Sequence, residues 1–419
     1  MDKKCRICGD ILNVFLPFGK VPISNTYLTK EQLDGLNIGE FKEYMYDLEA
    51  AFCNNCKMVQ LTEFVPYEKY ITPQEDGSTE YLFYSSTSQF MQKHFAEFAQ
   101  EIATKFMKMN DLVVEIGSND GIMLQAFDQA KVRVLGIEPG TNVANVARAK
   151  GIENVTEFFT EDLARKIVNT KGKAKAILSA NVILNIGDLH ELMRGINILM
   201  DDNGVFVFQD PYMPYILEKN SFDQFYDEHV YYFCITSLQN LMKMHGMEIF
   251  DVQEQDVHGG SMRVYVKRQS DSRPISEKVR KILEQEDKIG LNSFSTYQAF
   301  AERVERIKKN LRDFLRLLKE NGYKLAGYAA TCKSSTALNY CGIGTEFLDY
   351  ISDSTPEKQR KFSPGKHIPI VSPEHFRQDN PPYTLLLAWN HEKEILGKEK
   401  DYLKRGGKFI IYNPCLRIV

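Results

Sequence analysis

A regular alternation of strand and helix signals begins near residue 112 and limits the central part of the chain to one class of fold. Short apolar runs are separated by stretches of helical spacing, as in a parallel, doubly wound α/β sheet. The runs are LVVEIG, RVLGIEP, AILSAN and GVFVFQDP. Because ligands of such sheets bind at the carboxyl ends of the strands, we expect the functional site among the residues that follow these runs.

The pattern changes three times along the 419 residues, which predicts four regions. Paired cysteines and turn residues precede the alternating part, a helical stretch follows it, and strand and helix signals then resume. Two apolar runs on either side of residue 258 predict an antiparallel hairpin. We expect a metal-binding module over residues 1–75, a Rossmann-like domain over 76–270, a helical connector over 271–321 and a second Rossmann-like α/β domain over 322–419.

Charge and hydropathy exclude several partners. The formal net charge is −4 and the pI is near 6.1, so no overall basic field would attract nucleic acid or an anionic membrane surface. No apolar run approaches the roughly 20 residues that span a bilayer, and MDKKCRICGD does not resemble a secretion signal. We expect a cytoplasmic enzyme for a small molecule, without nucleic acid or membrane partners, as a monomer or weak homo-oligomer.

Four of the eight cysteines form two CxxC pairs, Cys5 with Cys8 and Cys53 with Cys56. Each CxxC turn offers two sulfurs to one ion, so the four thiolates match a tetrahedral, structural Zn²⁺ site. Four protein ligands leave no coordination position open for catalysis. A redox role, or reduced cysteines without metal, is the alternative.

The first strand of the alternating region ends in an acidic residue and a glycine turn, EIGSNDG. Glycine in such a turn lets a ligand approach the backbone closely. The second strand ends at Glu138, about twenty residues further on, where a carboxylate can accept the hydroxyls of a ribose. The dinucleotide fingerprint G-x-G-x-x-G is missing, and a βα turn that binds nothing is the plain alternative.

This arrangement resembles the class I S-adenosylmethionine-dependent methyltransferases. The resemblance implies that the turn surrounds the methionine part of the cofactor, that Glu138 holds the ribose, and that Asn181 lies beside the sulfonium. Two adjacent phenylalanines would lie near the adenine, although such a pair also fits a core, and Asn181 also fits a helix cap. The expected cofactor residues are Glu115, Gly117, Asn119, Gly121, Glu138, Phe158, Phe159 and Asn181.

Beyond the fourth strand, a phenol, a carboxylate and an imidazole fall within four residues, at Tyr226, Glu228 and His229. A histidine can accept a proton near neutral pH, a nearby carboxylate can hold its tautomer, and a tyrosine can donate to a developing oxyanion. By itself, the motif Y-x-E-H is also compatible with a structural role.

Taken together, the motifs resemble those of the sugar C-methyltransferases that act on nucleotide-linked 4-keto-deoxysugars. In chain order they are the two CxxC pairs, TEYLFYSS at 79–86, EIGSNDG, YDEHVYYF, HGGSMRVY at 258–265, GYAATCKSSTALNYCGI and LLLAWNH. The resemblance implies S-adenosylmethionine as methyl donor and a nucleoside-diphosphate 4-keto-deoxysugar as substrate. It also implies methylation of the carbon next to the ketone, C3, through an enolate.

The same resemblance assigns roles to the reaction residues. His229 is the general base, Glu228 positions it, and Tyr226 stabilises or protonates the enolate oxygen. Tyr84, with Tyr81 as second choice, is the tyrosine that the N-terminal region supplies.

The chain departs from the family pattern N-V-x-x-H after the third strand, where Asn185 stands in place of the histidine. An asparagine cannot act as a general acid or base. It can replace a histidine that only forms a hydrogen bond; if that histidine moves a proton, the acceptor or the methylated atom differs in this chain. We place Asn185 and His258 among the substrate-binding residues, with a hairpin bulge as the alternative for His258.

In the C-terminal domain, ATCKSST follows a strand and opens a helix, where backbone amides, hydroxyls and one lysine suit a phosphate. The P-loop spacing is missing, so nucleotide hydrolysis is not expected. By resemblance this domain holds the nucleotide-sugar, with helix caps or solvated surface as the alternative interpretation. The expected contacts are Lys333, Ser334, Asp353, Lys358 and His391.

Three other functions fit parts of the pattern. The acceptor could be a sugar hydroxyl or amine, which needs a base and no enolate. Zinc modules also accompany RNA-modifying methyltransferases, which the acidic balance opposes. A nucleotide-sugar binding protein without activity would leave Y-x-E-H without a purpose.

Overall fold

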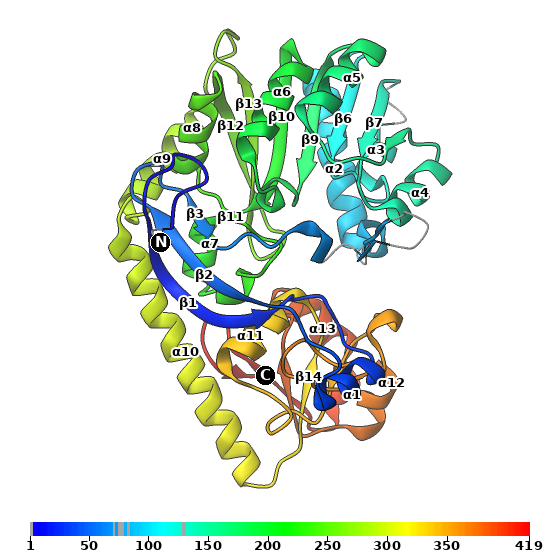
Figure 1. Cartoon of the computed structure of the whole chain (residues 1–419), viewed down its shortest axis with the longest axis vertical. Coiled ribbons are helices and arrows are strands. Elements are labelled where there is room, and N and C mark those ends of the chain that lie inside the picture. Colours follow the sequence, from blue (N-terminus) through cyan, green and yellow to red (C-terminus); the bar gives the residue numbers. More distant parts are fainter. Residues whose placement is uncertain (1–2, 70–71, 74–78, 82–83, 128–130) are drawn as a thin grey trace.

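In the computed structural model, two α/β units lie one above the other, joined along one side by a long helix and by a curved N-terminal ribbon (Figure 1). The structure describes residues 3–69, 72–73, 79–81, 84–127 and 131–419. The long helix is α10 (Phe294–Glu320), and the ribbon consists of β1 (Leu12–Pro22) and β2 (Met45–Cys53). The two units are thus connected at two places.

The N-terminal module is built on an antiparallel sheet in the order β1-β2-β3-β11. It includes β3 (Val59–Leu61) and β11 (Tyr231–Tyr232), and α1 (Lys30–Ile38) lies between β1 and β2 in sequence. The strand β11 comes from the middle of the chain: Tyr231 pairs with Gln60 and Tyr232 with Val59. The segment that carries Y-x-E-H therefore ends in the sheet of the N-terminal module.

The central unit is a seven-stranded sheet in the order β12-β13-β10-β9-β6-β7-β8. The strands from β10 to β8 in this order are parallel, and the antiparallel hairpin of β12 and β13 extends the sheet at the β10 edge. The predicted doubly wound sheet and the hairpin are confirmed. The strands are β6 (Leu112–Ile116), β7 (Arg133–Ile137), β8 (Asn154–Val155), β9 (Ala174–Ala180), β10 (Met200–Pro211), β12 (Met247–Gln255) and β13 (Ser261–Arg268).

Successive side chains of these strands point to opposite faces of the sheet and enter two different cores. On β6, Val113 packs with Phe98 of α2, whereas Val114 joins the larger core that also contains Ile196 of α6. The helices of this unit are α2 (Gln89–Phe106), α3 (Ile122–Gln125), α4 (Thr141–Ala149), α5 (Glu161–Lys171), α6 (Leu189–Leu199), α7 (Met213–Glu218) and α8 (Ile235–Met244).

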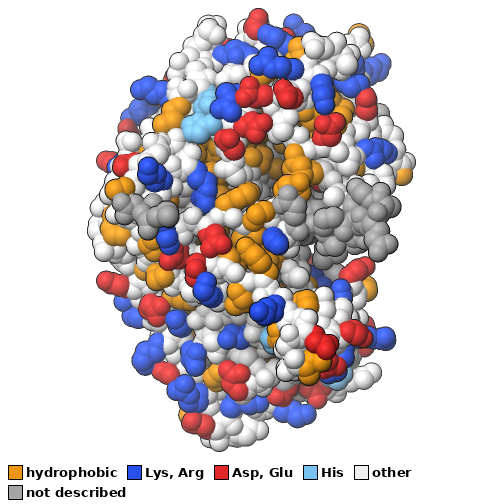
Figure 2. Space-filling model, in the orientation of Figure 1, with side chains coloured by type: hydrophobic (Ala, Val, Ile, Leu, Met, Phe, Trp, Pro, Cys, Tyr) orange, Lys and Arg blue, Asp and Glu red, His pale blue; other side chains and the backbone are white. Residues whose placement is uncertain are grey.

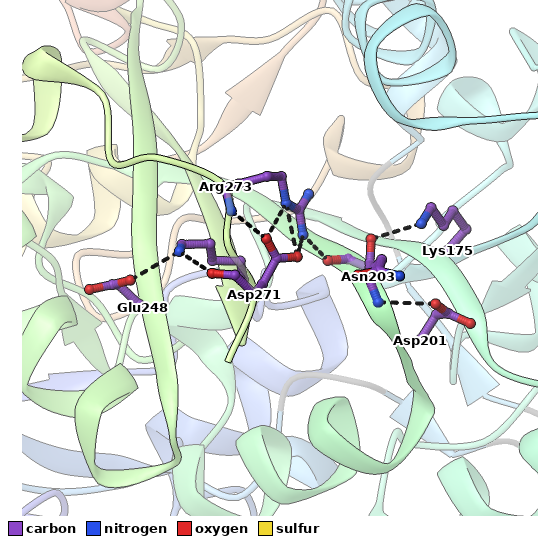
Figure 3. A network of polar contacts seen from close by, with 8 residues as sticks. Lys175, Asp201, Asn203, Glu248, Asp271 and Arg273 are labelled. Atoms are coloured by element: carbon purple, nitrogen blue, oxygen red, sulfur yellow. Dashed lines mark hydrogen bonds and ion pairs between the residues drawn. The ribbon is translucent and has the colours of Figure 1, made fainter. Parts of the chain in front are cut away.

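A polar network fixes the end of the sheet that is remote from the carboxyl ends of the parallel strands (Figure 3). Arg273 pairs with Asp271 and donates to the carbonyl of Gly204 at 2.6 Å, near the start of β10. Lys267 of β13 pairs with Glu248 of β12 at 3.2 Å and donates to the Asp271 carbonyl at 2.8 Å. The hairpin is therefore tied to β10 at this end.

The helices α9 (Glu277–Lys288) and α10 lead to a six-stranded sheet in the order β16-β15-β14-β17-β18-β19, parallel except for β19. Counted along the chain, this is the strand order of a Rossmann fold, so the second Rossmann-like domain is confirmed. Its elements are β14 (Leu325–Tyr328), α11 (Cys332–Cys341), β15 (Ile351–Ser352), β16 (Ile370–Val371), α12 (Pro373–Asp379), β17 (Tyr383–Leu386), α13 (Glu392–Lys398), α14 (Lys400–Lys404), β18 (Lys408–Ile411) and β19 (Arg417–Ile418).

In the part of the chain that the structure describes, no helix has both the length and the apolar character that crossing a membrane requires. On the face shown in Figure 2, hydrophobic side chains gather in a band between the upper and lower units.

Candidate active site

The four expected metal ligands come together in the N-terminal module. The sulfur of Cys5 lies 3.5 Å from that of Cys56, and the sulfur of Cys8 lies 3.4 Å from that of Cys53. All four sulfurs lie within 4.8 Å of one another. A tetrahedron with Zn–S bonds of about 2.3 Å has edges of roughly 3.8 Å, so the four sulfurs fit one Zn²⁺ ion.

Gln60 links this metal centre to the segment that carries Y-x-E-H, here called the reaction segment (residues 222–233). Its side-chain amide donates to the Cys5 sulfur at 3.0 Å, and its backbone pairs with Tyr231. The next residue, Leu61, donates its backbone N–H to the carbonyl of Val230 at 2.9 Å. The metal centre therefore supports the two residues that directly follow His229.

The EIGSNDG turn at the end of β6 is tightly packed. Gly117 and Gly121 have φ of 74° and 77°, a region that favours glycine. A Cβ on Gly117 would lie 2.3 Å from a methyl carbon of Val182, and a Cβ on Gly121 would lie 2.4 Å from Ile152 Cδ1. Only glycine fits both positions without a shift of these neighbours.

Glu138, directly after β7, links the carboxyl ends of β6 and β7. Its carboxylate accepts the backbone N–H groups of Asn119 at 2.9 Å and Gly140 at 2.8 Å. Burial raises the pKa of Glu138, and these two amides partly oppose the shift. A carboxylate offers about four lone pairs, so two acceptor positions remain for the hydroxyls of a ribose.

Two of the expected cofactor residues carry a buried oxygen without a hydrogen bond from any described residue. They are Glu115 Oε2 and Asn181 Oδ1. Burial raises the pKa of Glu115 well above its ordinary value, and the nearby charges of Glu138 and Asp120 add to the shift. Since its side-chain oxygen is unmatched, Asn181 is not the helix cap of the alternative interpretation. Unmatched acceptors suit a ligand with ammonium and hydroxyl donors, and S-adenosylmethionine carries both.

The two phenylalanines expected near the adenine lie in different surroundings. Phe158 is 42% exposed, and its ring centroid lies 4.2 Å from that of Tyr67. Phe159 packs against the main core, where a Cβ on Gly195 would lie 2.8 Å from its ring. Phe158 therefore stays accessible to a ligand, whereas Phe159 fits the core alternative.

Residues near position 85 anchor the TEYLFYSS segment to the cofactor turn. The backbone N–H of Ser85 donates to Asn119 Oδ1 at 3.0 Å, and that of Ser86 donates to Asp120 Oδ2 at 3.2 Å. Residues 82–83 of this segment lie outside the described residues. The segment thus runs over the glycine turn.

The two candidate tyrosines of this segment differ in position. The hydroxyl of Tyr81 donates to Glu228 Oε2 at 3.4 Å, in the reaction segment. The hydroxyl of Tyr84 accepts from Asn142 of α4 at 2.9 Å, at the cofactor end. Tyr81 therefore lies beside the Y-x-E-H motif, and which of the two tyrosines takes part in the reaction stays a prediction.

His229 is buried, and both nitrogens of its ring are hydrogen-bonded. Nδ1 lies 3.1 Å from the carbonyl oxygen of Gln224, which can only accept, so Nδ1 carries the proton. Nε2 therefore accepts from the Tyr226 hydroxyl at 2.5 Å. Burial lowers the pKa of His229 well below its ordinary value, and the Lys333 ammonium lowers it further. The result is a neutral imidazole with its basic nitrogen toward Tyr226.

The Glu228 carboxylate makes no hydrogen bond to the His229 ring, because both ring nitrogens have other partners. Glu228 instead accepts from Tyr81, and its Oε1 lies 3.9 Å from the sulfur of Cys332. Burial raises the pKa of Glu228 to about 8, and the charge of Asp227 adds to the shift. The raised pKa favours the protonated, neutral form of Glu228 near pH 7.

Two expected substrate contacts, Lys333 and His258, lie near enough to His229 to lower its pKa. Lys333 Nζ and His258 Nε2 are buried atoms without hydrogen-bond partners among the described residues. Burial, with Lys333 as the next cause, lowers the pKa of His258 to about 3 and also lowers the pKa of His391. An unmatched ammonium beside an unmatched imidazole suits an anionic group such as a phosphate.

The other expected contacts of the C-terminal domain have partners within the protein. Ser334 forms a capping box with Thr331, as in the helix-cap alternative. Asp353 accepts the backbone N–H of Ala330 at 2.7 Å, and Lys358 Nζ donates to the Ala330 carbonyl at 2.9 Å. These contacts shape the loop that precedes α11.

Asn185 lies in a short 3₁₀ turn, η4 (Ile183–Asn185). The carbonyl of Leu184 in this turn accepts the backbone N–H of Val230 at 2.9 Å. Asn185 Oδ1 has no hydrogen bond from a described residue. Asn185, which stands where the family pattern has histidine, thus lies in a turn that is hydrogen-bonded to Val230. Its side-chain oxygen is an acceptor without a described donor.

Sequence reasoning missed the groups that hold His229 in place. The Gln224 carbonyl also accepts from the Tyr232 hydroxyl at 3.2 Å, and a backbone carbonyl leaves no signal in a sequence. Asp223 is fully buried and bonded to the C-terminal domain. An acid inside the aromatic run SFDQFY could have indicated this burial.

The sheet, the glycine turn and the carboxylate after the second strand define the class: the protein is an S-adenosylmethionine-dependent methyltransferase. Three family models match along the chain, described as a zinc binding domain over residues 5–70, a methyltransferase domain over 88–252 and a C-methyltransferase C-terminal domain over 256–414. The chain is 33% identical to the C-methyltransferase NovU of Streptomyces niveus over 419 residues, 99% of this chain and 96% of NovU. It belongs to the C-methyltransferase family.

Solved structures resemble the chain only weakly. Magnesium protoporphyrin IX methyltransferase of Synechocystis PCC 6803 with bound S-adenosylmethionine is 14% identical over 42% of this chain and 79% of that one, with a TM-score of 0.32. The CcbJ methyltransferase of Streptomyces caelestis is 14% identical over 42% and 89%, with a TM-score of 0.33. Likeness at this level supports no inference about the substrate.

Proposed function

We propose that the protein methylates C3 of a nucleoside-diphosphate 4-keto-deoxysugar through an enolate, with His229 as general base. The observation that supports this most is the state of His229: a buried, neutral imidazole with Nδ1 protonated and Nε2 basic. A general base must be unprotonated at the working pH, and this arrangement supplies that form.

The proton moves as follows in this proposal. Nε2 of His229 takes the proton from C3, and the electron pair of the broken C–H bond enters the enolate. Burial raises the pKa of Tyr226 well above its ordinary value, so its O–H is intact and can turn from Nε2 to the enolate oxygen. S-adenosylmethionine, when bound, supplies an electrophilic methyl group. C3 would bond this methyl as the methyl–sulfur bond breaks, with S-adenosylhomocysteine as the leaving group. The ketone re-forms, and His229 loses its proton to solvent.

Two sets of residues would hold the ligands. In this proposal the turn at Gly117, the Glu138 carboxylate and the unmatched oxygen of Asn181 would hold the cofactor. Lys333 and His258 would take the diphosphate, because their buried nitrogen atoms are unmatched and lie close to His229. Tyr81 connects the cofactor end with the Y-x-E-H segment, because its backbone N–H donates to Asn142 of α4 and its hydroxyl donates to Glu228.

The test is mass spectrometry with S-adenosylmethionine and thymidine-, cytidine- and guanosine-diphosphate 4-keto-deoxysugars in deuterated water. The proposal expects methyl transfer together with exchange of deuterium at C3. In His229→Gln, both reactions should fall at least 100-fold while S-adenosylmethionine affinity stays within about twofold. His375→Gln, which changes an exposed histidine of α12, is the control. Methyl transfer without exchange would indicate an oxygen or nitrogen acceptor instead.

A further inference from the structure

The short turn before His229 is held by the C-terminal domain. This turn, η5 (Phe222–Gln224), carries the fully buried Asp223. The Asp223 carboxylate accepts from Trp389 Nε1 at 2.6 Å and from the Tyr412 hydroxyl at 2.7 Å. Both donors lie beyond residue 322, in the second α/β unit. Hydrogen bonds to a charged acceptor are stronger than those between neutral groups.

The same domain also holds the residue on the other side of Gln224. The Thr336 hydroxyl of α11 donates to the carbonyl of Phe225 at 2.7 Å. The carbonyl of Gln224 therefore lies between two residues that the C-terminal domain fixes. It is this carbonyl that accepts from Nδ1 of His229 at 3.1 Å and from the Tyr232 hydroxyl at 3.2 Å.

Nothing else in the described surroundings of His229 would keep its proton on Nδ1. The second nitrogen faces the Tyr226 hydroxyl, which can donate or accept. If the Gln224 carbonyl moved away, the proton could shift to Nε2 and donate to Tyr226. Nε2 would then have no lone pair with which to take a proton from carbon.

We propose that Asp223 is a positioning residue for His229: Trp389 and Tyr412, by holding Asp223, keep the Gln224 carbonyl on Nδ1 and so keep Nε2 basic. The C-terminal domain thus contributes to the state of the base as well as to ligand binding. This inference rests on the proposed role of His229 only for its effect on the reaction, since the tautomer itself can be observed without substrate.

The direct test is nitrogen NMR of the full chain labelled with ¹⁵N-histidine, which distinguishes protonated from unprotonated ring nitrogens. The His229 signals are assigned by their loss in His229→Gln. Wild type should show His229 with the proton on Nδ1. Asp223→Asn and Tyr412→Phe should each populate the Nε2-protonated form. Tyr402→Phe is the matched control, because Tyr402 is also a buried tyrosine of this domain and its hydroxyl contacts Thr384 and Lys408 instead.

Kinetics on the same variants separate this inference from the proposed function. In Asp223→Asn and Tyr412→Phe, kcat should fall roughly 10-fold or more, with S-adenosylmethionine affinity unchanged, because part of the general-base contribution is lost. A His229 that keeps Nδ1 protonated in both folded variants would overturn the positioning role. A shifted tautomer with undiminished kcat would support the positioning role and overturn the role of His229 as base.

Discussion

Glu228 shows at the residue scale how burial turns a carboxylate into a neutral group. Its pKa is raised to about 8 by burial and by Asp227, from an ordinary value of 4.5. Between these two values the unfolded chain is ionised at this position while the folded chain keeps its proton. Folding stability therefore decreases as the pH rises from about 4.5 to 8.

Glu228→Gln has no proton to lose, so its stability relative to wild type should increase with pH across this window. One pKa unit corresponds to about 1.4 kcal/mol, so the gain at pH 8 is on the order of a few kcal/mol. Chemical denaturation of both proteins at pH 5 and pH 8 measures it. Glu357→Gln, at an exposed carboxyl, should show no such trend. Parallel pH profiles for Glu228→Gln and wild type would mean that Glu228 is ionised in the folded protein.

Side-chain chemistry in the sequence indicated which residues of the site come together, but it left their pairing open. The four cysteines were recognisable from their spacing, whereas the roles within Y-x-E-H came from the resemblance to the sugar C-methyltransferases. The partner of His229 Nδ1 was not, because it is the backbone of Gln224 and depends on how the turn folds. The choice between Tyr81 and Tyr84 likewise depends on where a loop crosses the sheet.

Glu286 illustrates at the element scale how one helix fixes the start of another. It is buried on α9 and accepts the backbone N–H groups of Ile235 and Thr236 at the start of α8, at 2.6 and 2.8 Å. It also accepts the hydroxyls of Thr236 and Tyr212, each at 2.6 Å. The carboxylate thus caps α8 and anchors the residue that follows β10.

Glu286→Ala should destabilise the fold by about 3–5 kcal/mol, since it leaves buried donors unmatched. Urea denaturation measures the change. Glu284→Ala on the same helix removes an exposed carboxylate whose one ion pair with a described residue is to Arg280, and it should cost less than about 1 kcal/mol. Equal losses in the two variants would contradict the capping role.

Elements with a clear period were predictable, whereas short strands made by distant partners were not. The antiparallel hairpin follows from its two apolar runs, and β12 and β13 pair as expected. β11 has two residues and pairs with β3, about 170 positions earlier in the chain. Such a pairing depends on tertiary contacts that local sequence does not encode.

At the scale of the whole molecule, the metal centre and the reaction site share one sheet. Removal of Zn²⁺ by a chelator, or Cys5→Ser, should therefore reduce kcat and the thermal unfolding temperature together. S-adenosylmethionine affinity should change much less, because the glycine turn lies in the central sheet. Metal analysis, calorimetry and turnover on the same samples measure this. Cys415→Ser, at an exposed cysteine outside the cluster, is the control. Full activity in metal-free protein would contradict this coupling.

The pairing of β3 with β11 also limits how such a protein can exchange domains with its relatives during evolution. Three family models describe it as consecutive pieces, yet the first piece completes a sheet with a strand that lies inside the second. An N-terminal module taken from a relative would have to match the surface of β11, and a chain without the module would expose an unpaired strand edge. Recombination at the boundary between the first two pieces therefore preserves the fold only if β3 and β11 change together and still pair.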